Sequence, residues 1–166
     1  MNYAQLITAV KGAISTRIEA QGGKVVVAES LEEAHTYLEA APNGWRLILH
    51  WEGYGEHPEA RMGMTVHQVA TVIQAPRGLP KDKDPTKDKP GGVKGFHHYI
   101  KTVSEWMCAM KFPDGTGADN AGFAPAGSQW LQTVPGYAAH VLNWKLNAAL
   151  PPYSQNIILS FPHLNP

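Results

Sequence analysis

Two segments decide the fold of this chain: Arg46-Leu47-Ile48-Leu49-His50-Trp51-Glu52-Gly53 and Val66-His67-Gln68-Val69-Ala70-Thr71-Val72-Ile73-Gln74. In the first segment Leu47, Leu49 and Trp51 alternate with the other side chains, which is the pattern of a strand with one well-buried face. The second segment is rich in β-branched residues, and the glycines and proline between the two segments interrupt a strand. We therefore expect an antiparallel pair at the centre of a sheet.

Three elements are expected before this pair. Apolar residues at spacings of three and four predict an amphipathic helix from Asn2 to Ala20. The short β-branched run Lys24 to Ala28 predicts a strand beside the pair. Ser30 followed by Glu33 is a capping signature, and the apolar stripe after it predicts a second helix over Leu31 to Ala41.

A third, long helix is expected from Gly95 to Lys111, because its apolar residues form one broad face. This helix should cross the sheet and cover its core side. Trp51, Val69, Val103 and Trp106 are then expected to share one core. Cys108 lies on or beside the apolar stripe and is expected in the core as well.

The segment Tyr137 to Leu150 is ambiguous, since it contains good helix formers. Its larger apolar residues alternate with Asn143, Lys145 and Asn147, and this periodicity favours a strand. Ser128 to Val134 is expected to be the preceding strand. Apolar residues between prolines in the tail, Asn156 to Phe161, would add an edge strand or dock on a neighbouring subunit.

Two stretches, about 77–94 and 113–127, are expected to be mobile surface loops. The first has almost no apolar residues and interleaved charges, so it has little to bury against its ordering entropy. It is either a solvated insertion or a functional loop. The second contains five glycines, which disfavour regular structure.

Length and charge limit the class of protein. The 166 residues are expected to form a single α+β domain, with a mixed, mainly antiparallel β-sheet packed by an N-terminal helix and a long central helix. Lys and Arg number 14, as do Asp and Glu, and this balance disfavours general affinity for nucleic acid. One cysteine excludes an intrachain disulfide, and the absence of a long apolar run predicts a soluble, intracellular protein.

The residues that could carry chemistry do not form a recognised signature. His50-Trp51-Glu52 matches half of a zinc deaminase motif, but the second, cysteine-rich half is missing. His57 and the pair His97-His98 lack metal-ligand spacing. Gly115-Thr116-Gly117 is not followed by the residues of a phosphate loop, and Asp114, Asp119 and Asn120 do not match a calcium loop. We therefore predict no catalytic, cofactor-binding or metal-binding residues.

The order of these elements resembles the tail terminator (tail completion) proteins of long-tailed bacteriophages. The resemblance is one of architecture, and its best-matched segments are Leu6 to Ile18, Arg46 to Gly53 with Val66 to Gln74, Phe96 to Met110, and Ala138 to Ala148. This chain departs from the family by carrying the helix Leu31 to Ala41 and the tail after Pro151.

The resemblance implies a structural virion protein rather than an enzyme, without a cofactor. It implies a ring, hexameric in the family, that is assembled in the bacterial cytoplasm and caps the tail tube. Its partners would be the tail-tube protein and a neck or connector protein, while DNA passes through the channel without specific binding. Partner contacts are then expected at the interleaved charges of the first loop: Lys81, Asp82, Lys83, Asp84, Lys87, Asp88 and Lys89.

Two alternatives remain beside this interpretation. The first is another phage neck or baseplate adaptor, for which the same physical arguments hold. The second is a small intracellular enzyme or ligand-binding protein that uses a cleft between the helix at 95–111 and the loop around Asp114.

Overall fold

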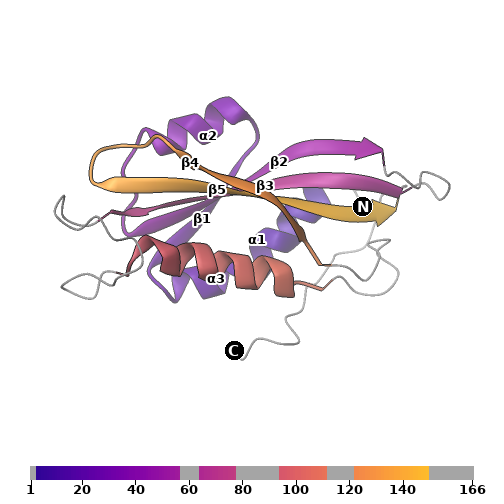
Figure 1. The fold of residues 1–166 in the computed structure, drawn as a ribbon, viewed down its shortest axis with the longest axis horizontal. Coiled ribbons are helices and arrows are strands. Elements are labelled where there is room, and N and C mark those ends of the chain that lie inside the picture. The colour runs from indigo at the N-terminus through magenta and orange to yellow at the C-terminus, as the bar shows by residue number, and fades with distance from the viewer. Residues whose placement is uncertain (1–2, 57–63, 78–93, 112–121, 150–166) are drawn as a thin grey trace.

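In the part of the chain that the structure describes, the fold is α+β, with three helices and a five-stranded mixed sheet (Figure 1). The computed structural model describes residues 3–56, 64–77, 94–111 and 122–149. Within them the elements are α1 (Tyr3–Glu19), β1 (Gly23–Ala28), α2 (Leu31–Leu38), β2 (Trp45–Glu56), β3 (Met64–Pro76), α3 (Phe96–Ala109), β4 (Ala124–Leu131) and β5 (Tyr137–Ala149). No helix among these is both long and apolar enough to cross a membrane.

The strands follow the order β1-β2-β3-β5-β4. β1 pairs with β2 in parallel, and every other neighbouring pair is antiparallel. The expected pairing of the two deciding segments is confirmed, with Leu47 opposite Ile73. A register shift between Trp51 and Gly53 interrupts the ladder, and Gly53 adopts a φ of 125° that a side chain would oppose.

Helices cover both faces of the sheet, which differs from the expectation of one buried face. Leu47 and Leu49 belong to the core under α1 and α3, whereas Ile48 belongs to a second core under α2. Figure 1 shows α1 and α3 on one side of the strands and α2 on the other. Ile48 is fully buried because α2 packs over the face that the alternation alone assigned to solvent.

The core under α1 and α3 contains Val69, Val103 and Trp106, and the half-buried Trp51 packs against it, as expected. Two expectations for α3 have different outcomes. It has 14 residues against 17 in α1, so its description as a long central helix is not confirmed. Cys108 is exposed rather than in the core, because the buried residues of α3 lie on the opposite side of the helix.

The capping signature of α2 is confirmed. The backbone N–H of Glu33 donates to Ser30 Oγ at 3.1 Å. In return, Glu33 Oε2 accepts from the backbone N–H of Glu29 at 2.7 Å, one residue before the cap. The helix ends at Leu38, earlier than the expected Ala41.

The ambiguous segment near the C-terminus is a strand, because residues 137–149 pair with β3 along their whole length. β4 begins at Ala124, so the expected loop over 113–127 is wrong for its last four residues. A register shift between Pro125 and Gly127, where Gly127 has a φ of 129°, lets this glycine-containing segment pair. Residues 78–93 of the first expected loop and the tail at 156–161 lie outside the described residues.

Candidate interaction site

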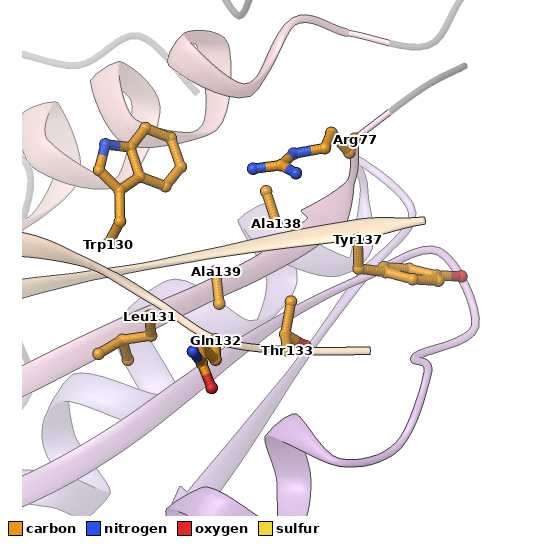
Figure 2. A pocket seen from close by; sticks show the side chains of 8 residues that line it. All are labelled: Arg77, Trp130, Leu131, Gln132, Thr133, Tyr137, Ala138 and Ala139. Atoms are coloured by element: carbon orange, nitrogen blue, oxygen red, sulfur yellow. The ribbon is translucent and has the colours of Figure 1, made fainter. Parts of the chain in front are cut away.

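A cleft of about 330 Å³ lies around the first residues of β5 (Figure 2). We call it the hairpin cleft, because it lies where β4 turns into β5. Eight residues line it: Arg77, Trp130, Leu131, Gln132, Thr133, Tyr137, Ala138 and Ala139.

The hairpin cleft exists because small side chains lie between two large ones. β5 lies between β3 and β4, so those two strands are about 10 Å apart, two strand spacings. Arg77 directly follows β3, and its backbone N–H donates to Gly136 O at 2.8 Å. Trp130 comes from β4, and the side chains of Trp130 and Arg77 lie on the same side of β5 as Ala138 (Figure 2). Alanine fills little of the space between them.

Trp130 is held in place although it is exposed. Its ring lies 4.5 Å from the ring of His140 in an edge-to-face arrangement, and 5.1 Å from the ring of Phe96 on α3. Even so, 52% of Trp130 is accessible to solvent. A large aromatic ring that is both positioned and exposed costs little side-chain entropy when a partner covers it.

Arg77 gives the hairpin cleft a positive charge, since no other lining residue is charged. Its side chain is exposed, and no ion pair of Arg77 is found among the described residues. A guanidinium next to an aromatic surface favours planar, negatively charged groups, above all carboxylates.

The opposite wall of the hairpin cleft is fixed by hydrogen bonds to the last residue of α2 and to the segment that follows this helix. Thr133 Oγ1 donates to Leu38 O at 2.8 Å, and the hydroxyl of Tyr137 donates to Pro42 O at 3.1 Å. These two hydroxyls are therefore engaged within the fold. The exposed side chain of Gln132 is the lining amide that faces solvent.

The residues considered for chemistry are not brought together. His50 Nδ1 lies 3.0 Å from Ala28 O and joins β2 to β1. His97 is exposed on α3, and no group of three potential metal ligands occurs among the described residues. His57 lies outside the described ranges, and so do Asp114, Asp119 and Asn120 of the second loop. The same holds for the expected interface residues: Lys81, Asp82, Lys83, Asp84, Lys87, Asp88 and Lys89.

Because two histidines are buried, the protein is expected to be less stable in mild acid than at neutral pH. Burial lowers the pKa of His67, and burial together with the nearby His97 lowers the pKa of His140. The indole N–H of Trp51 donates to His67 Nδ1 at 3.2 Å, which requires a neutral ring. Between the lowered pKa values and the ordinary value of about 6.5, the unfolded chain binds more protons than the folded one.

The free energy of unfolding should therefore be highest above about pH 6.5 and fall as the pH drops through the lowered pKa values. Melting temperatures measured from pH 7.5 to 5.5 test this. A double variant, His67→Gln with His140→Gln, should have a flatter profile, while His35→Gln, at an exposed position on α2, should keep the original one. If the melting temperature changes equally with pH in the original protein and in both variants, the pH dependence does not come from His67 and His140.

The sequence alone did not single out Trp130 or Arg77. Trp130 lies in an expected strand, and Arg77 begins an expected loop. Only the placement of β4 beside β5, and of β3 on the other side of β5, brings the two together. The sequence contained one indication of an exposed interaction residue: Trp130 is a large aromatic residue in a segment without charges.

Comparison with known proteins identifies no family for this chain. Its sequence matches no model of a protein family, and a search among curated proteins finds no significantly similar sequence.

Proposed function

We propose that the protein is a structural component of a bacteriophage virion, of the tail terminator type. Copies of the chain form a ring, a hexamer if the family pattern holds, that caps the tail tube and joins it to the neck. The ring assembles in the bacterial cytoplasm and lets DNA pass through its channel. The chain itself performs no catalysis in this proposal.

The proposal is supported by the secondary structure of the segments that resemble the family: each is a helix or a strand where the resemblance requires one. The resemblance needs a strand at 138–148, where helix propensity made the sequence ambiguous, and this segment lies within β5. It also needs an N-terminal helix, an antiparallel pair and a packing helix, which correspond to α1, β2 with β3, and α3. The balanced charge supports a channel that does not hold DNA tightly.

The mass of the protein in solution, alone and with purified tail tubes, tests the proposal. We expect a single oligomer several times the 18.1 kDa of the chain, seen as a ring by electron microscopy and bound at one end of the tubes. Tubes grown with the protein should stop elongating. A monomer that neither forms rings with tubes nor limits their length would overturn the proposal.

Deletion of Lys81 to Lys89 tests where the partners bind. These interleaved charges can pair with complementary charges on an adjacent subunit or tube protein. We expect the deletion to leave the melting temperature nearly unchanged and to abolish tail completion. Replacement of the same segment by a glycine-serine linker of equal length is the matched control for loop length, and it should fail in the same way. Normal particles from either variant would show that these charges are not the interface.

A further inference from the structure

The hairpin cleft opens where β4 and β5 stop pairing. The last pair between these strands joins Leu131 to Ala139, whereas β5 pairs with β3 as far as Tyr137. Tyr137 and Ala138 therefore have β3 as their one neighbour among the described strands. Because neighbouring strands lie about 5 Å apart, a missing neighbour leaves room beside these two residues.

The walls of the hairpin cleft are held in place by contacts within the fold. The backbone N–H of Arg77 donates to Gly136 O at 2.8 Å, and that of Tyr137 donates to Val134 O at 3.2 Å. The indole of Trp130 is fixed by its two ring contacts. With a volume of about 330 Å³, the cleft lies at the lower end of the range for small-molecule sites, which are mostly preformed.

Arg77 and Trp130 lie at opposite ends of the hairpin cleft. Trp130 pairs with His140. Arg77 directly follows Pro76, whose partner on β5 is Tyr137. Along β5 the two positions are therefore about four residues, or roughly 13 Å, apart. Figure 2 shows the guanidinium of Arg77 directed toward Trp130, which covers part of this distance. A ligand that touches both side chains must be elongated, with a different chemistry at each end.

The two ends of the hairpin cleft select an acid with an apolar tail. Arg77 is the one charged residue of the lining, and a planar guanidinium binds a carboxylate through two parallel hydrogen bonds. At the other end, 52% of Trp130 is exposed, and an indole packs well against another aromatic ring. Ala138 lies between them (Figure 2) and offers an apolar surface without filling the space.

We propose that the hairpin cleft binds a small amphipathic carboxylic acid. Its carboxylate accepts hydrogen bonds from the guanidinium of Arg77, its tail crosses Ala138, and its far end packs on the indole of Trp130. A nucleotide or another phosphate ester fits less well, because phosphate groups are usually bound by a helix N-terminus or by several successive backbone N–H groups. The inference goes beyond the role in a tail and does not depend on the ring.

Titration of the full chain with hydrocinnamate, a benzene ring joined to a carboxylate by a short alkyl chain, tests the inference. At low ionic strength, where an exposed charge is least screened, we expect a dissociation constant of about 1 mM, as usual for a ligand of this size. The neutral amide of the same acid lacks the charge, and acetate reaches only Arg77. Both should bind roughly tenfold more weakly. Equal affinity for the amide or for acetate would overturn the proposal.

Variants of the lining test where the acid binds. Arg77→Gln and Trp130→Ala should each weaken the binding of hydrocinnamate roughly tenfold, and Arg77→Lys, which keeps the charge without the planar fork, should be intermediate. Lys145→Gln, at an exposed position further along β5, is the matched control and should bind within about twofold of the original protein. Unchanged affinity in Arg77→Gln, or an equal loss in Lys145→Gln, would overturn the site.

The indole N–H signals in an NMR spectrum show which tryptophan the acid covers. The signal of Trp130, identified by its absence in Trp130→Ala, should shift as hydrocinnamate is added. Trp45 and Trp144 are each only 2% exposed, and their signals should not move. A shift of these signals without one of Trp130 would overturn the site. Binding by a monomer would support this inference and count against the proposed ring.

Discussion

Replacement of Trp106 by alanine is expected to lower the free energy of unfolding by about 3–5 kcal/mol, the usual range for truncating a large buried aromatic residue. Trp106 is 7% exposed and lies in the core that joins α1 and α3 to the sheet. Alanine would leave a cavity next to Val103 and Met107, which the surrounding strands cannot close without breaking their pairing. Urea denaturation followed by circular dichroism measures the change.

Two neighbouring substitutions serve as controls for Trp106→Ala. Glu105→Ala changes the next residue of α3, whose side chain is 53% exposed and lies 3.7 Å from Lys101. It should cost less than about 0.5 kcal/mol, as an exposed ion pair contributes little. Trp130→Ala removes the same side chain from an exposed position and should cost clearly less than Trp106→Ala. If all three proteins unfold at the same urea concentration, α3 does not pack on the sheet as described.

The sequence was sufficient to predict the elements whose periodicity is strong. The amphipathic pattern of α1 and the alternation in β2 and β5 predict element type correctly, because one face of each is buried continuously. Cys108 was misplaced because Met107, the residue before it, is buried, whereas one residue further along a helix the side chain direction turns by about 100°. Ile48 and His50 were misjudged because alternation cannot reveal a second helix on the other face.

The hairpin cleft could not be predicted from the sequence either, because it also depends on contacts between elements that are distant along the chain. Trp130 belongs to β4 and Arg77 directly follows β3, two strands that are not neighbours in the sheet, and only the pairing of both strands with β5 brings these residues to the same side of it. Register depends on where Gly127 and Gly136 bend the chain, since both take positive φ values. The alanines that leave room between Trp130 and Arg77 carry no signal of their own in the sequence.

A buried glutamine joins three parts of the fold that are distant in sequence. Gln74 on β3 is fully buried. Its Nε2 donates to Leu38 O at 3.3 Å and Ala40 O at 3.1 Å, the carbonyls at the end of α2, and to Thr133 Oγ1 at 2.7 Å. Its Oε1 accepts from Arg46 Nη1 at 3.3 Å. One side chain thus satisfies carbonyls that the end of α2 leaves unpaired, and ties them to the β4–β5 hairpin.

Gln74→Leu keeps the volume and removes these hydrogen bonds. We expect a loss of about 1–3 kcal/mol, the usual cost of leaving a polar group inside the fold without its partner, because Ala40 O loses its donor while Leu38 O still accepts from Thr133 Oγ1. Gln68→Leu, on the same strand but exposed, is the control and should change stability by less than about 0.5 kcal/mol. Thr133→Val removes the hydroxyl that bridges Gln74 and Leu38. The double variant should lose less than the sum of the two single losses, since both act on one network. Strict additivity, or equal effects of Gln74→Leu and Gln68→Leu, would show that α2 is held to the sheet by apolar packing alone.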